Sequence, residues 1–334
     1  MRFGPVPLNE AEGAMLAHSV RLARGRLSKG HVLTAADVDT LRDLGMARVI
    51  VARLDPGDVA EDAAAQTVAE ALVPDPAGQG LRLTRAFTGR VNLIAEGPGI
   101  VTLDADRLNA LNRIDPMLTL ATVPDHQQMT PGGMVATVKV IAYAVAGESL
   151  AAARQVLAGP PAIRLHPPVL KTARLIVTEI RGGPGDKGAE AVRARLTALG
   201  MEMTGPVLVP HEAEPLSEAI AAAGEDLVLV LTGSATSDIH DVAPSGLALA
   251  GGQLEHFGMP VDPGNLLFLG ALGPRPVIGL PGCARSPALN GADWVLARLA
   301  CGIPVKGQDI AGMGVGGLLK EIPTRPQPRS RRRE

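Results

Sequence analysis

The stretch DLVLVLTGSATSDIHDVAP, residues 226–244, decides the fold of the second half of this chain. A short apolar run bounded by turn residues is typical of a strand that is buried on both faces. A loop of small and acidic residues follows the run. Asp241 then precedes a helix-like segment, and aspartate is a common N-cap. The stretch therefore predicts a strand–loop–helix unit.

Two further units of the same kind flank this one. RLIVTEI (174–180) is followed by RGGPGDKG and a helix-like segment, and RPVIGL (275–280) is followed by PGCARS and the helix-like segment 286–302. Buried strands that alternate with helices imply a mostly parallel sheet with helices on both faces. We therefore expect an α/β domain with three αβα layers over residues 169–305.

The first half of the chain shows short strand-like runs punctuated by Gly and Pro. We expect a small α+β domain over residues 1–75 and a β-rich α+β domain over residues 76–168, because the Pro/Gly-rich stretch 74–80 is typical of a boundary. Residues 306–334 end in PTRPQPRSRRRE, which has no apolar periodicity. They are predicted to be a flexible, basic tail.

One helix of the first domain can be described in detail. AADVDTLRDLG (35–45) has helical spacing, Thr34 is its expected N-cap, and Leu41 and Leu44 are expected to point inward.

Composition excludes several classes of function. The net charge is −2, so no overall field attracts nucleic acid or an anionic membrane, and aromatic residues are only 2% of the chain, too few for a base-stacking platform. The two cysteines and seven histidines show no metal-ligand or disulfide spacing. Without a signal peptide or a long apolar run, we expect a cytoplasmic protein with no membrane or nucleic-acid partner.

The loops after the three strands carry the candidate site. Because ligands bind outside the carboxyl ends of the strands in an open parallel sheet, we expect these loops to converge. Their glycine-rich backbone and their hydroxyl groups suit a phosphorylated small molecule, and their carboxylates suit acid/base work or Mg²⁺. The same residue types also turn chains and cap helices, so the residues alone leave both interpretations open.

Three segments resemble the molybdenum-cofactor biosynthesis (MoCF) domain of molybdopterin adenylyltransferases and molybdopterin molybdenumtransferases. GSATSDIHDVAP (233–244) is similar to the family pattern GGTGxSPRDVTP, MPVDPGNLL (259–267) to MKPGKP, and IGLPGCARS (278–286) to GLPGNPxS. The matched positions are Gly233, Asp241, Pro244, Pro263, Gly264, Pro281, Gly282 and Ser286. The chain also resembles the pterin-binding half of fusions with a molybdopterin nucleotidyltransferase. Because it carries no second nucleotide-binding domain, we expect a stand-alone form.

The resemblance implies a MoCF-type fold and molybdopterin as ligand or substrate, with molybdate and Mg²⁺ as further possibilities. It implies catalytic roles for Asp241 and Asp186. The remaining ligand contacts that it implies come from Gly233, Ser234, Thr236, Ser237, Asp238, Pro263, Gly264, Pro281, Gly282, Arg285 and Ser286. Among these, Ser234, Thr236, Ser286 and Arg285 are expected to hold the pterin phosphate.

Three departures from the family pattern divide the functional hypotheses. Ser234 replaces a glycine, and Asp262 and Asn265 replace two lysines. A carboxylate in place of a cation reverses the local field and should repel molybdate, although Arg285 could restore one positive charge. One hypothesis is a molybdenumtransferase-like enzyme that inserts molybdate. The other is a non-catalytic carrier, with a nucleotidyltransferase or apo-molybdoenzyme as partner and a homo-oligomer as its possible state.

Two simpler hypotheses stand beside these. Asp241 could serve as a helix N-cap, and Asp238 could be a solvated loop carboxylate. An unrelated nucleotide-binding α/β enzyme is disfavoured, because neither GxGxxG nor GxxxxGK[ST] follows an expected strand.

Overall fold

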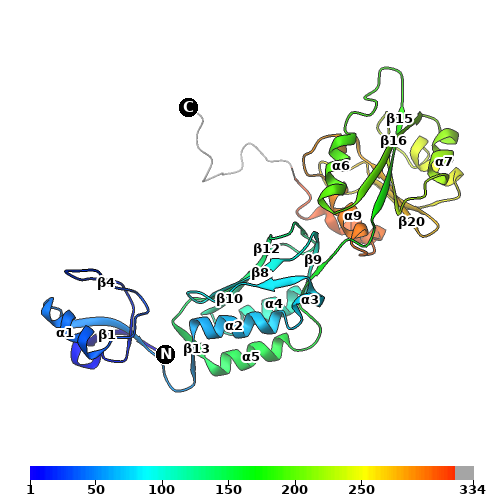
Figure 1. The fold of residues 1–334 in the computed structure, drawn as a ribbon. Helices are drawn as coiled ribbons and strands as arrows, with labels where there is room; N and C mark the ends of the chain where they lie inside the picture. The colour runs from blue at the N-terminus through cyan, green and yellow to red at the C-terminus, as the bar shows by residue number, and fades with distance from the viewer. Residues whose placement is uncertain (320–334) are drawn as a thin grey trace. The chain divides into compact units, whose positions relative to one another are not determined.

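The computed structural model describes residues 1–319, and the chain divides into two compact units (Figure 1). Unit one comprises Met1–Gly97 and Val101–Leu165, and unit two comprises Pro98–Ile100 and the chain from His166 onward.

Unit one begins with a small three-stranded sheet in the order β1-β5-β2 that packs on one helix. Its elements are β1 (Arg2–Pro7), η1 (Leu8–Glu10), β2 (Met15–Leu16), β3 (Val20–Arg21), β4 (Arg26–Leu27), α1 (Ala35–Asp43) and β5 (Arg48–Arg53). The Thr34 side chain accepts from the backbone N–H of Asp37, whose carboxylate accepts from Thr34 in return, so Thr34 is the N-cap of α1 as expected. Leu41 is buried, but the expectation for Leu44 was wrong. Leu44 is exposed because the helix has already ended at that residue.

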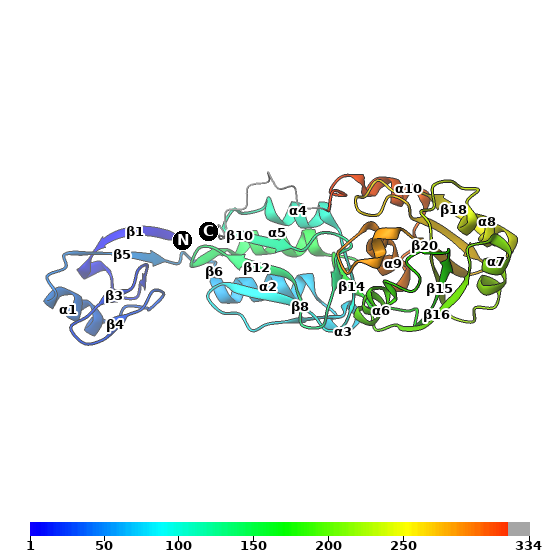
Figure 2. The ribbon, with the colours of Figure 1, turned by 90° about the horizontal axis from the view of Figure 1, so that it is seen from above.

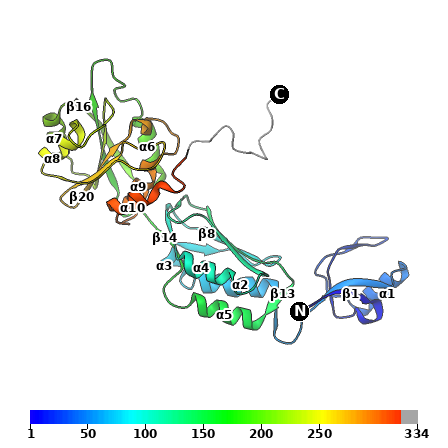
Figure 3. The same cartoon turned by 180° about the vertical axis from the view of Figure 1, so that it is seen from behind.

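The rest of unit one contains a four-stranded antiparallel sheet in the order β10-β12-β8-β7, a three-stranded sheet in the order β11-β9-β14 and the pair β13-β6. Residues of α2, α4 and α5 share a buried cluster with the four-stranded sheet, and Figure 3 shows these helices beside it. Its elements are β6 (Asp58–Ala60), α2 (Glu61–Leu72), α3 (Pro76–Gln79), β7 (Leu81–Leu83), β8 (Arg90–Ala95), β9 (Gly99–Leu103), α4 (Ala105–Asn112), β10 (Leu118–Thr122), β11 (Gln128–Met129), β12 (Met134–Val140), β13 (Ala144–Ala146), α5 (Gly147–Leu157) and β14 (Ile163–His166).

The Pro/Gly-rich stretch between α2 and β7 does not separate two hydrophobic cores. Residues on both sides of it, such as Val68 and Leu93, belong to one buried cluster. The side chain of Gln79 is buried and donates to the carbonyls of Leu72 and Ile163, which fixes the stretch in place. The domain boundaries expected from the sequence stay predictions, because a domain is defined by independent folding.

Unit two contains a six-stranded sheet in the order β16-β15-β17-β20-β19-β18. The first four strands are parallel, β19 runs antiparallel to β20, and β18 runs antiparallel to β19. Its elements are β15 (Thr172–Glu179), α6 (Ala189–Ala198), β16 (Glu202–Pro210), α7 (Ala213–Ala221), β17 (Leu227–Leu231), α8 (Val242–Leu249), β18 (Gln253–Phe257), β19 (Phe268–Leu272), β20 (Arg275–Leu280), η2 (Gly282–Arg285), α9 (Gly291–Ala300), α10 (Gly307–Ala311) and η3 (Gly312–Gly314). The expected α/β fold with a mostly parallel sheet is confirmed.

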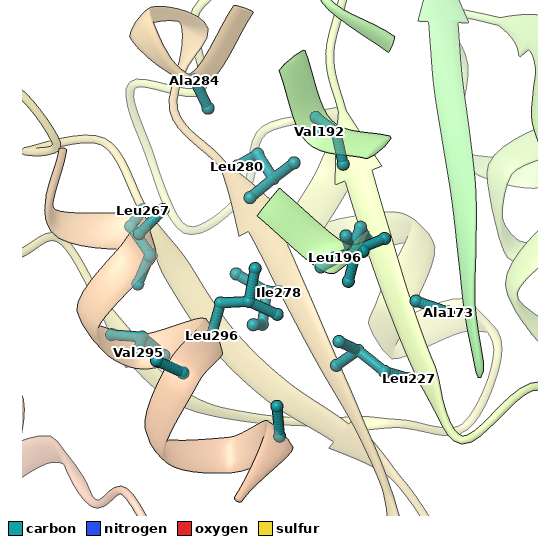
Figure 4. Close-up of a cluster of buried hydrophobic side chains, with 14 of the residues drawn as sticks. Ala173, Val192, Leu196, Leu227, Leu267, Ile278, Leu280, Ala284, Val295 and Leu296 are labelled. Atoms are coloured by element: carbon teal, nitrogen blue, oxygen red, sulfur yellow. The ribbon is translucent and has the colours of Figure 1, made fainter. Parts of the chain in front are cut away.

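Alternate residues of β17 serve opposite faces of this sheet. Leu229 belongs to a buried cluster with residues of α6 and α9, whereas Val230 belongs to a second cluster with residues of α7 and α8. Figure 2 shows the two helix pairs on opposite sides of the strands, and Figure 4 shows Leu196, Ile278 and Leu296 of the first cluster directed toward one another. The three layers follow directly from this alternation.

Three details of unit two differ from the sequence-based expectations, and one is the unexpected strand β19. Strand β16 was not expected, because it is an edge strand with mostly exposed side chains and contains Pro206. The helix expected over 286–302 begins only at Gly291, so Ser286 is not at a helix start. Pro287 disfavours helical backbone at Ser286, and Asn290 forms a capping box with Asp293.

No helix within residues 1–319 is both long enough and apolar enough to cross a membrane.

The packing of β20 gives a stability prediction. A Cβ added at Gly279 would lie 2.0 Å from the buried ring of Phe268. We expect Gly279→Ala to lower the free energy of unfolding by roughly 1–3 kcal/mol through overpacking. Gly224→Ala is the matched control, because nothing lies within 4 Å of the added Cβ. Equal urea midpoints for the two variants would contradict the packing described here.

A second prediction concerns pH. Arg174 donates to the carboxylate of Glu225, and this interaction lowers the pKa of Glu225 from 4.5 to about 2, with a smaller contribution from the Thr204 hydroxyl. A depressed folded-state pKa stabilises the fold above the unfolded pKa, and this stability is lost as the pH falls from 4.5 toward about 2.

In urea unfolding at neutral pH, Glu225→Gln should therefore be less stable than the wild type. This stability deficit should shrink toward zero when the measurement is repeated near pH 2. Glu190→Gln is the control, because Glu190 pairs with Arg193 while 86% exposed, and it should show little deficit at any pH. A deficit for Glu225→Gln that stays constant with pH would contradict the assignment.

Candidate functional site

The loops that follow β15, β17 and β20 meet at the carboxyl edge of the sheet. Arg285, which follows β20, donates through Nη1 to the carbonyl oxygens of Gly185 (3.0 Å) and Lys187 (2.5 Å) in the β15 loop. Its Nη2 donates to the carbonyl oxygen of Thr232 (2.9 Å), directly after β17. The expected convergence of the three loops is therefore confirmed.

Arg285 thus acts as a clamp between main-chain segments. Three of the five N–H donors of a guanidinium are engaged by carbonyls, and burial lowers the pKa of Arg285 from its ordinary value. Gly188 lies so close that an added Cβ would be 2.6 Å from the Cα of Arg285. The contact with a phosphate expected for Arg285 stays a prediction, and the structure shows a positioning role.

Arg195 of α6 anchors the loop after β20 from the other side. It donates to the carbonyls of Ala284, Ser286 and Ala288, to a carbonyl one turn earlier in its own helix, and to the carboxylate of Asp293 (2.5 Å). All five of its donors are therefore engaged. Its side chain is 12% exposed and that of Asp293 is 11% exposed, so the loop is held by a largely buried ion pair.

Asp241 is the N-cap of α8. One carboxylate oxygen accepts from the backbone N–H of Val242 (2.8 Å), and the other accepts from that of Ser237 (3.0 Å). The structure therefore shows the capping role for Asp241, and a catalytic role remains a proposal. Asp238 is exposed, and its carboxylate accepts from the backbone N–H of His240.

The residues of the β17 loop differ in their access to solvent. Thr236 is 7% exposed and its hydroxyl lies 3.3 Å from that of Thr232, which donates to the carbonyl of Ser234. Thr236 therefore lies inside the loop. Ser234 and Ser237 are exposed, so their hydroxyls face solvent at the carboxyl edge.

The β15 loop presents charges of both signs. Asp186 and Lys187 are exposed, and within residues 1–319 neither side chain has a hydrogen-bond or ion-pair partner. Sequence reasoning included Asp186 and missed Lys187. The sequence signal that could have identified Lys187 is its position next to Asp186, in the loop directly after a buried strand.

The MPVDPGNLL segment lies against the start of α9. The backbone N–H of Gly291 donates to the carbonyl of Pro263 (2.9 Å), and a Cβ at Gly264 would lie 2.8 Å from that nitrogen. Pro281 is buried, whereas Gly282 and Ser286 are exposed, and the Ser286 hydroxyl accepts from a backbone N–H two residues later.

A buried threonine missed by sequence reasoning joins two strand ends. Thr178, at the end of β15, is fully buried, and its Oγ1 accepts from the backbone N–H of Gly233 (2.9 Å). The same oxygen lies 2.7 Å from Nδ1 of His211. A Cβ at Gly233 would lie 2.8 Å from the carbonyl oxygen of Thr178, which explains the glycine that opens the loop.

The described part of the chain, residues 1–319, contains no group of three or more His, Cys, Asp or Glu side chains that could hold a metal ion.

Comparisons with known proteins give one family match and several distant structural likenesses. A family described as a domain of unknown function (DUF8806) matches residues 5–53. No curated protein matches this chain.

The structure is similar to three solved structures at low TM-score. The molybdopterin biosynthesis MoeA protein from Pyrococcus horikosii is 13% identical, with 90% of this chain and 75% of that chain covered and a TM-score of 0.32. Molybdenum cofactor biosynthesis protein B is 16% identical, with coverages of 39% and 88% and a TM-score of 0.27. A molybdenum cofactor biosynthesis protein from Pyrococcus furiosus is 12% identical, with coverages of 93% and 65% and a TM-score of 0.24.

The clamp gives a prediction that is independent of any ligand. Arg285→Lys keeps the charge but cannot reach three carbonyls at once, so we expect a loss of about 1–3 kcal/mol in the free energy of unfolding. We also expect faster hydrogen exchange in residues 180–188 and 232–241. Lys187→Met is the control, because only the main chain of Lys187 contacts the clamp. Exchange that rises in only one of these two loops would contradict a clamp that holds both.

Proposed function

We propose that unit two binds molybdopterin at the carboxyl edge of its sheet and acts in molybdenum-cofactor biosynthesis or handling. The proposal rests on the three segments that resemble the MoCF domain and on their arrangement. Arg285 of segment 278–286 donates to the carbonyl of Thr232, the residue directly before segment 233–244, and residues 259–267 meet the start of α9 through Pro263 and Gly291. Residues 53 positions apart in sequence thus lie together, and this observation carries the proposal.

The exposed groups of the loops have the chemistry that a pterin phosphate requires. The hydroxyls of Ser234 and Ser237 donate to phosphate oxygens, and the ammonium group of Lys187 supplies a cation at the same edge. Asp186 accepts hydrogen bonds from ring N–H groups of the pterin. Thr236, Asp241 and Arg285 support this site by fixing the shape of the loops.

Binding without molybdate insertion is the form that the contacts favour. Arg285, the cation expected to compensate for the replaced lysines, is engaged by carbonyls, and Asp262 stands where the resemblance expects a lysine. An oxyanion such as molybdate needs fixed positive charge at the transferring centre. We therefore propose a carrier that presents the pterin to a nucleotidyltransferase or an apo-molybdoenzyme, with molybdenumtransferase activity as the second candidate.

Within residues 1–319 no group of three His, Cys, Asp or Glu side chains could hold Mg²⁺. Mg²⁺ commonly binds through one or two carboxylates together with substrate phosphates. Asp186 is the exposed carboxylate that such a shared site would use, and no step of the proposal depends on the metal.

The test is a calorimetric titration of the full chain with molybdopterin. We expect a Kd in the micromolar range or below. Asp186→Asn, which removes a carboxylate with no described side-chain partner, should weaken binding about ten-fold or more without changing the unfolding midpoint. Asp58→Asn should leave binding unchanged, because Asp58 belongs to unit one and its carboxylate pairs with the N-terminus. Absence of binding by the wild type would overturn the proposal.

Adding molybdate to the complex separates the two candidates. If the protein is a carrier, the bound molybdopterin stays metal-free after molybdate is added. If it is a molybdenumtransferase, molybdopterin is converted to molybdenum cofactor under the same conditions. Formation of molybdenum cofactor, detected by reconstitution of an apo-molybdoenzyme, would favour the enzyme and contradict the carrier.

A further inference from the structure

The Thr178 hydroxyl is a junction between the ends of three neighbouring strands. Thr178 is the second-last residue of β15, Gly233 lies two residues after β17, and His211 directly follows β16. Oγ1 of Thr178 contacts the backbone nitrogen of Gly233 and Nδ1 of His211, and the backbone N–H of His211 donates to the carbonyl of Glu179. The imidazole is therefore held at the carboxyl edge through both its ring and its main chain.

The burial of the Thr178 hydroxyl favours one tautomer of His211. A hydroxyl carries one proton, and Oγ1 of Thr178 already accepts from the N–H of Gly233. Because Thr178 is fully buried, its own proton needs an acceptor, and Nδ1 of His211 lies 2.7 Å away. With Nδ1 as that acceptor, the neutral ring carries its own proton on Nε2.

The Nε2–H group is available to a ligand. The side chain of His211 is half-buried, and within residues 1–319 its Nε2 has no protein hydrogen-bond partner. A partly buried donor with a fixed direction is the kind of polar group that orients a ligand in a site. Its ring is connected through Thr178 to Gly233, which directly precedes Ser234 in the chain.

We propose that His211 is a ligand-binding residue that donates through Nε2–H to a phosphate oxygen of the bound pterin. Thr178 is a positioning residue, because it holds both the tautomer of His211 and the start of the β17 loop. This inference rests on the proposed function, since it assigns a contact within that same site.

Two substitutions separate ligand binding from a purely structural role. His211→Asn keeps an oxygen near the position of Nδ1, which can accept from Thr178, but has no atom at the position of Nε2. His211→Gln places an amide N–H near the position of Nε2. We expect His211→Asn to weaken molybdopterin binding by about ten-fold or more while its unfolding midpoint stays close to the wild-type value, and His211→Gln to bind within about three-fold of the wild type.

The tautomer is measured separately, in the ligand-free protein. Imidazole ¹⁵N chemical shifts at alkaline pH should show the proton of His211 on Nε2 in the wild type and in Thr178→Ser, which keeps the hydroxyl. Thr178→Val should lose this preference. A proton on Nδ1 in the wild type would overturn the inference whatever the ligand.

The outcomes of the two proposals are distinguishable. Wild-type binding that His211→Asn leaves unchanged overturns the role of His211 and leaves the proposed function intact. No binding by the wild type overturns both.

Discussion

The hydrogen bonds from the Arg285 guanidinium to the main chain are the constraint on which the candidate site depends. Loops after parallel strands share an edge of the sheet, but nothing in strand geometry fixes one loop against the next. Arg285 supplies that fixation, because its planar donors reach two carbonyls after β15 and one after β17. Arg195 in turn donates to the carbonyls of Ala284 and Ser286, on either side of Arg285. Two arginines therefore fix this edge of the sheet one after the other.

The layered fold was predictable because it follows from the spacing of apolar side chains along the strands and helices. In β17 every residue is apolar and buried, and its alternate residues meet different helix pairs, so one short run indicates both faces of the sheet. Strand β16 escaped prediction because it lies at the sheet edge, where burial no longer selects apolar residues. The late start of α9 depends on the capping box of Asn290, which competes with Ser286 as a possible start.

The positions of the candidate residues were predictable, but their hydrogen bonds were not. The sequence places Asp241, Ser234 and Arg285 after strand ends, and the structure brings their loops together. Whether one of these side chains faces solvent depends on whether it hydrogen-bonds to the main chain. Main-chain carbonyls cannot be located from the sequence, because every residue carries one. The roles of Arg285 and Thr178 therefore became visible only in the structure. The ligand contacts of all these residues stay predictions.

The central claim is that the carboxyl edge of the unit-two sheet is the molybdopterin site. Hydrogen exchange of the wild-type chain with and without molybdopterin tests the location directly. The account predicts slower exchange in residues 180–188, 211–212 and 232–241 and unchanged exchange at the opposite edge, in residues 222–226. Protection confined to unit one, or to the opposite edge, would contradict it.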